Sequence, residues 1–226
     1  MAWDYAAQIH SLTGFDADSS STSEEGTETY QALAAQWLTD AAKEVINILP
    51  PKLKEKCITE STINNSPTTL DLDAFGEIFY ITRLSADSDG VRVPCRKVQS
   101  MYGELTGDST SLHYATVTDP VYWISSSSDT AIINVNPAPT ANQTAIVYHV
   151  GYPSVVYNAN TISNFPDEAE YLVPLRAAIT AVEYKLNFEE DAELYMPMLS
   201  TLKVQYQEGV LALQTGSTIP KQQGKK

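Results

Sequence analysis

Apolar residues recur every three or four positions in several stretches of the chain, and this spacing predicts amphipathic helices. The clearest of them covers residues 27–49, where Thr27 or Thr29 can cap the first turn. Pro50 and Pro51 follow directly and should end the helix, because proline donates no backbone hydrogen bond. A short amphipathic helix is also predicted close to the N-terminus.

Two further helices are predicted towards the end of the chain, over residues 171–186 and 191–213. The junction between them is short, and this predicts an antiparallel helical hairpin. Pro174 and Pro197 fall inside these patterns, so we expect a kink or a delayed start at each.

The middle of the chain has a different pattern, with short runs rich in Thr, Ser, Val, Ile and Tyr. Gly, Pro, Asn and Ser separate these runs at the spacing typical of an antiparallel sandwich or barrel. Strands are predicted over residues 77–84, 91–96, 121–125, 130–136 and 144–152.

This order of elements predicts an α+β fold. We expect a helical bundle, made of one N-terminal helix and the C-terminal antiparallel helical hairpin, with an inserted antiparallel β-sandwich or barrel-like domain. We expect an N-terminal helical part at 1–56, with a flexible acidic loop at 16–26, and then a β domain at 57–160. The helical hairpin is expected at 161–213 and an extended C-terminal tail at 214–226.

The net charge of the chain disfavours one class of function. The 226 residues include 14 Lys and Arg against 28 Asp and Glu, a formal net charge of −14. A surface that grips DNA phosphates needs clustered cations, so a basic DNA reader is disfavoured. No run of apolar residues is long enough to span a membrane, and the first residues lack the pattern of a signal peptide.

Candidate chemistry is sparse. His10, His113 and His149 lie far apart in sequence, and Cys57 and Cys95 lack the spacing of a zinc or redox motif. The spacing leaves open a nucleophile–base pair assembled by the fold, but no signature supports one. No phosphate-binding glycine motif is present. We therefore expect no catalytic residue, no metal site and no cofactor, and we do not expect an enzyme.

The 13 tyrosines have two possible explanations. Tyrosine is enriched at protein interfaces because its ring is large and its tip is polar. It is also common in ordinary strands. The sequence alone does not separate the two.

Several short sequence segments together resemble the head-to-tail adaptors of tailed bacteriophages, the tail tubular protein A group. In the β-rich region these are the strand run at residues 77–83 with its Asp-Gly turn and the tracts at 94–98, 111–116, 119–124 and 136–139. In the last region they are the tract at 165–173, Lys185-Leu186 and residues 193–197. The resemblance covers about two-thirds of the chain and lies in the residue pattern and the order of the segments.

The resemblance implies a virion structural protein, assembled in the host cytoplasm and located in the neck between capsid and tail. About twelve copies would form a ring beneath the portal protein and extend the channel for DNA ejection. Tail or nozzle proteins, or other neck proteins, would be further partners. Double-stranded DNA would pass an acidic wall without specific binding, and no membrane is involved.

The same resemblance assigns roles to two sets of residues. The C-terminal tail would dock on the portal through Gln214, Ile219, Pro220, Lys221, Lys225 and Lys226. The helical hairpin would form the contacts between subunits through Tyr171, Leu175, Leu194, Met198, Leu202 and Tyr206.

A second function remains open from the residues. The β domain could be a sandwich that binds a ligand or glycan on a virion or cell surface. In that case Tyr114, Tyr122 and Trp123 would form an exposed platform for stacking. A ring that binds a portal would favour the adaptor, and a persistent monomer that binds glycan would favour the module.

Overall fold

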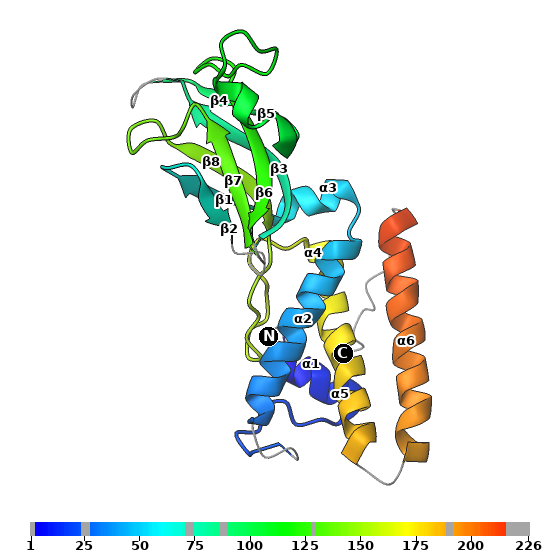
Figure 1. Ribbon diagram of the computed structural model, residues 1–226. Helices are drawn as coiled ribbons and strands as arrows, with labels where there is room; N and C mark the ends of the chain where they lie inside the picture. Colours follow the sequence, from blue (N-terminus) through cyan, green and yellow to red (C-terminus); the bar gives the residue numbers. More distant parts are fainter. Residues whose placement is uncertain are drawn as a thin grey trace. The chain divides into compact units, whose positions relative to one another are not determined.

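The computed structural model describes residues 3–23, 28–70, 75–85, 90–127, 130–188 and 192–215. The chain divides into two compact units, a helical unit of Met1–Cys57 with Pro153–Lys226 and a β-rich unit of Ile58–Tyr152 (Figure 1). The prediction of an α+β fold is confirmed. Residues 153–160, expected in the β domain, belong to the helical unit.

Helix α2 (Tyr30–Ile48) is the helix with the clearest pattern in the sequence, and the structure confirms it. The Thr29 hydroxyl accepts a hydrogen bond from the backbone N–H of Ala32 at 3.2 Å and so caps the first turn. The helix ends before Pro50, and Pro51 then begins a separate single turn, α3 (Pro51–Lys54). Its buried face consists of Ala34, Leu38, Ala41, Ala42, Val45 and Ile46.

Helix α1 (Tyr5–Thr13) begins at an Asp4 cap and ends at Gly14, whose φ of 70° suits glycine. The acidic stretch that follows was expected to be a flexible loop. Over its described part it packs against α2: Ala17 is buried, and Gln31 donates hydrogen bonds to the carbonyls of Asp18 and Ser19. Residues 24–26 of the expected loop lie outside the described residues.

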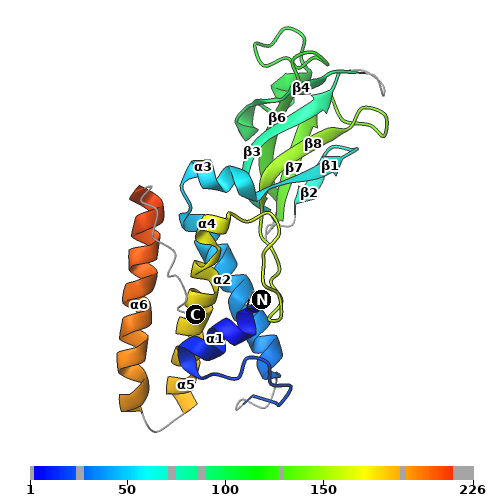
Figure 2. The same cartoon turned by 180° about the vertical axis from the view of Figure 1, so that it is seen from behind.

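The helical hairpin consists of α5 (Leu172–Phe188) and α6 (Ala192–Thr215), preceded by the short α4 (Asp167–Glu170). Its antiparallel arrangement, as predicted, brings Gly209 against Leu172 and pairs Lys203 with Glu183 at 2.8 Å. The break between α4 and α5 places Pro174 in the first turn of α5, where a missing N–H costs little. Figures 1 and 2 show α5 between α2 and α6, and α5 contacts both.

Eight strands in the described part of the β-rich unit form two open sheets, ordered β1-β8-β3-β4 and β2-β7-β6-β5. Their bounds are β1 (Ile58–Ile63), β2 (Thr68–Leu70), β3 (Phe75–Leu84), β4 (Arg92–Pro94), β5 (Arg96–Lys97), β6 (Val121–Ser127), β7 (Thr130–Asn136) and β8 (Ala145–Gly151). The predicted strands are confirmed, with 91–96 split in two at Cys95. Strands β1 and β2 were not predicted.

The registers are antiparallel except at one edge, where β5 runs parallel to β6. An entirely antiparallel domain was therefore the wrong expectation, and the described strands close no barrel. One buried cluster takes side chains from both sheets: Ile63, Ile81, Cys95, Tyr122, Ile133, Val135, Ala145 and Val147. This apolar cluster is the core of the unit.

Candidate functional site

Helix α6 has two apolar faces. One face packs on α5 through Leu199, Leu202 and Gly209, which are buried. The other carries Met196, Val204 and Leu211, which are 57%, 50% and 60% exposed. These three are spaced by eight and seven residues, about two helical turns each, so they lie within roughly 80° of one another on one side of the helix. We call these three residues the α6 stripe.

A second exposed apolar patch belongs to the segments around the N-terminus. Trp3 is 62% exposed and Val156 is 54% exposed. The backbone N–H groups of Tyr5 and Ala6 donate to the carbonyls of Ala159 and Tyr157, which ties the two segments together. We call Trp3 and Val156 the Trp3 patch.

These two apolar surfaces belong to different parts of the helical unit. In Figures 1 and 2, α6 lies on one side of α5, and the N-terminus and the segment after β8 lie on its other side, beside α2. The unit therefore presents two separate apolar surfaces.

The residues that the resemblance assigns to the subunit interface are divided between core and surface. Leu175 and Leu202 are buried inside the helical unit, where a second copy cannot contact them. Met198 and Tyr206 are half-buried, and Tyr171 is exposed. Leu194 lies in α6, but its side chain is outside the described part. The exposed apolar side of α6 is thus carried by other residues.

The tail assigned to portal docking begins later than expected. Gln214 lies in the last turn of α6, which runs to Thr215. The remaining assigned residues lie outside the described residues: Ile219, Pro220, Lys221, Lys225 and Lys226.

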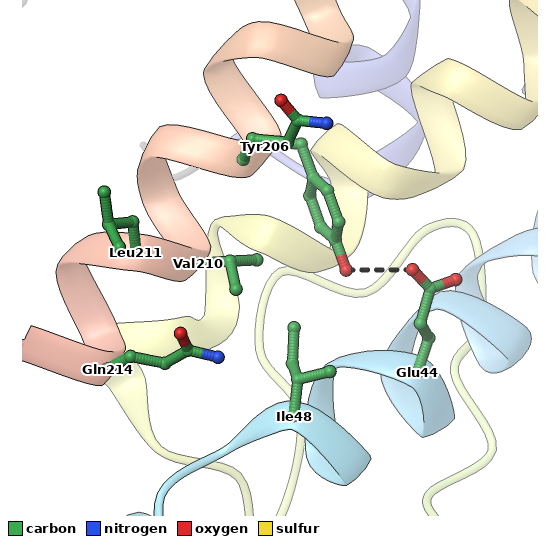
Figure 3. A pocket seen from close by; sticks show the side chains of 7 residues that line it. Glu44, Ile48, Tyr206, Val210, Leu211 and Gln214 are labelled. Carbon is green, nitrogen blue, oxygen red and sulfur yellow. Dashed lines mark hydrogen bonds between the residues drawn. The ribbon is translucent and has the colours of Figure 1, made fainter.

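Glu44 on α2 connects the three long helices. Its Oε2 accepts a hydrogen bond from Arg176 Nε at 2.7 Å, and its Oε1 accepts one from the Tyr206 hydroxyl at 3.1 Å (Figure 3). Burial, and then the negative charge of Glu44, raise the pKa of Tyr206, so its phenol stays protonated and donates. Both carboxylate oxygens of Glu44 are satisfied within the chain.

An open and largely apolar groove of about 300 Å³ lies beside this network (Figure 3). It runs between the C-terminal halves of α2 and α6. Its lining residues are Glu44, Ile48, Tyr206, Gln207, Val210, Leu211 and Gln214. Sequence periodicity did not reveal this groove, because it depends on how two helices far apart in sequence meet.

Arg83 is the most unusual buried residue of the β-rich unit, at 2% exposed. Its guanidinium donates to the carbonyls of Leu84, Pro137 and Ala138 at 2.7, 2.8 and 3.3 Å, and to Gln143 Oε1 at 2.8 Å. No carboxylate in the described ranges pairs with it. Burial lowers its pKa. Its hydrogen bonds fix the connection between β7 and β8.

Ser61 and His149 form the kind of pair that the sequence left open. Ser61 Oγ lies 3.0 Å from His149 Nε2, and His149 Nδ1 lies 3.0 Å from the carbonyl of Val150. A carbonyl only accepts, so Nδ1 carries a proton, and in the neutral imidazole Nε2 accepts from the serine hydroxyl. His149 is buried on β8 between two strands, so we interpret this pair as satisfying a buried imidazole.

No group of three or more His, Cys, Asp or Glu that could hold a metal ion occurs among the described residues. Cys57 and Cys95 are buried and free. Burial raises the pKa of Cys57 to about 11 against the weaker opposing effect of Lys54, and that of Cys95 to about 12 against that of Arg83. Neither thiol is a nucleophile at neutral pH.

We expect both thiols to resist alkylation in the folded protein. At about pH 8 roughly one thiol in a thousand or fewer would be ionised, and burial also blocks the reagent. Mass spectrometry after a short iodoacetamide treatment should show unmodified folded chain and two modifications per chain after unfolding in guanidinium. Rapid labelling of Cys95 before unfolding would contradict this account of the core.

The aromatic platform expected for a ligand-binding module is not formed. Tyr122 is buried in the core of the β-rich unit. The Trp123 ring packs against Gly103 so closely that a Cβ on Gly103 would lie 2.6 Å from it. Only Tyr114 of the three residues is exposed. Another aromatic pair, Tyr80 and Tyr148 on β3 and β8, stacks at 4.4 Å between ring centroids.

Comparison of the chain with protein-family models and with curated proteins gives no match. Within the described ranges, every helix is too short or too polar to cross a bilayer.

Proposed function

We propose that this chain is a head-to-tail adaptor of a tailed bacteriophage, which forms a ring beneath the portal and extends the DNA ejection channel. The observation that carries the proposal is the pair of separate apolar surfaces on the helical unit, the α6 stripe and the Trp3 patch. Large apolar side chains left in water along a helix are a common mark of a protein interface.

A closed ring needs two different surfaces on each subunit, because one face of each copy meets another face of the next. The α6 stripe and the Trp3 patch meet this requirement. Burying such side chains stabilises association by about 25 cal/mol per Å² of apolar surface removed from water. In this proposal Met196 and Val204 of one copy pack near Trp3 of its neighbour.

The finer architecture belongs to the same proposal. We interpret α2 with the hairpin of α5 and α6 as the bundle that builds the ring, and the two sheets as a β-sandwich that serves tail or other neck proteins. The segment after α6, with Ile219, Pro220 and three lysines, is the proposed contact to the portal. The protein acts without catalysis, metal or cofactor.

The net charge of −14 suits a channel that DNA passes through. An acidic wall repels phosphates and leaves the duplex free to slide, whereas a cationic wall would hold it. We therefore expect acidic side chains on the inner surface of the ring and no sequence-specific DNA contact.

The test is the mass of the assembly. The chain, alone or mixed with the portal ring of the phage that encodes it, should form a species that contains about twelve copies of 24.8 kDa. Mass photometry measures this directly. A chain that stays monomeric, ignores the portal and binds glycan would overturn the adaptor and favour the ligand-binding module.

A further inference from the structure

The groove between α2 and α6 has the character of a site for apolar side chains. Ile48, Val210 and Leu211 line it, and Tyr206 closes one end (Figure 3). Glu44 is the charged residue on its wall, and each of its oxygens already accepts one hydrogen bond, from Arg176 or from Tyr206. A ligand that binds here gains little from charge, so its contribution must come from apolar surface.

The size of the groove limits the occupant to a small segment. An apolar cavity of roughly 150 Å³ holds one benzene molecule. With about 300 Å³, this groove has room for two aliphatic side chains of the size of isoleucine and proline.

The chain itself supplies such a segment directly beyond α6. Among residues 216–226, Ile219 and Pro220 are the two large apolar residues, and glycine, serine, threonine, glutamine and lysine make up the rest. Gln214 lines the groove, and Ile219 follows only five residues later, a reach of roughly 17 Å.

We propose that the groove binds Ile219 and Pro220 of its own chain. The tail of a second copy would compete poorly, because a short tether gives the chain's own tail a local concentration in the millimolar range. The three tail lysines remain in water. This inference does not depend on the adaptor function. If the adaptor function holds, the tail leaves this groove when it binds the portal. Until then, the groove shields Ile219 from water.

Cross-linking in the full-length free chain tests this. Gln207→Cys places a thiol on the groove, and Lys221→Cys places one beside the two apolar residues without replacing them. The buried native cysteines do not compete. A short bismaleimide at low protein concentration should link the two within one chain about fivefold faster than in the matched control, Gln205→Cys with Lys221→Cys. Gln205 is exposed and lies outside the groove lining.

Adding Ile219→Asp to the Gln207→Cys pair should reduce the rate of cross-linking to that of the control, because a carboxylate does not enter an apolar groove. Circular dichroism checks that every variant is folded. Equal rates at the two positions, or no effect of Ile219→Asp, would overturn the proposal. Links between two chains in place of links within one would assign the groove to a second copy and would also overturn it. None of these results bears on portal binding, which is measured separately.

Discussion

Replacing Arg83 by leucine is expected to lower the free energy of unfolding of the β-rich unit by about 3–5 kcal/mol. The guanidinium donates four hydrogen bonds, three of them to backbone carbonyls. Leucine fills part of the space but donates none, so these buried oxygens would lose their partners at roughly 1–3 kcal/mol each before relaxation. Arg83→Lys should fall between the two, because one ammonium cannot reach every acceptor.

Hydrogen exchange measured by mass spectrometry localises this effect. Arg83→Leu should speed exchange in β3 and β8 and leave α2 and α5 unchanged, since Arg83 and its partners all belong to the β-rich unit. Arg96→Leu is the matched control, because Arg96 is exposed and its ion pair with Asp119 is worth about 0–1 kcal/mol. Equal protection in the two variants would contradict the structural role given to Arg83.

Charging the α6 stripe is expected to abolish assembly while leaving the fold intact. The double variant Met196→Asp with Val204→Asp places two carboxylates where the proposed interface excludes water, and we expect association at least about 100-fold weaker. Both residues are exposed in the single chain and lie outside the groove, so neither the unit nor the tail site should change. Analytical ultracentrifugation gives the affinity.

The control carries the same charge on another exposed side of the same helix, as Thr201→Asp with Gln205→Asp. It should assemble as the unmodified chain does. Trp3→Asp should also block assembly, because it charges the other proposed contact surface. A mixture of the stripe variant with Trp3→Asp should give dimers and nothing larger, because each pair retains one intact contact. Full assembly of either variant alone would exclude an interface between the α6 stripe and the Trp3 patch.

Local patterns predicted the elements well where the signal is contained in a short window. Helix α2 has a capping threonine, a regular apolar face and a double proline at its end, and each feature acts within a few residues. The strands β6, β7 and β8 are likewise short β-branched runs between turn residues. Strand β1 was missed because its pattern, with Thr59, Glu60 and Thr62, carries few apolar residues and is organised by its partner β8.

The functional surface was harder to predict, because α6 is apolar on more than one side. Periodicity places Leu202 on the predicted apolar face of this helix and leaves Val204 off it, so it gives no sign of a second apolar side. The structure buries Leu202 and exposes Val204. The position of α5 decides this, and α5 is set by long-range packing. Arg83 shows the same limit, since three of its four partners lie 54 to 60 residues further along the chain.

Electron microscopy of the chain bound to purified portal rings tests the adaptor proposal most directly. We predict a second ring stacked on the portal along the same axis, with a continuous central channel and with α6 of each copy facing the Trp3 patch of the next. Portal rings that remain bare, or that carry the chain at scattered positions without a coaxial channel, would contradict the proposal.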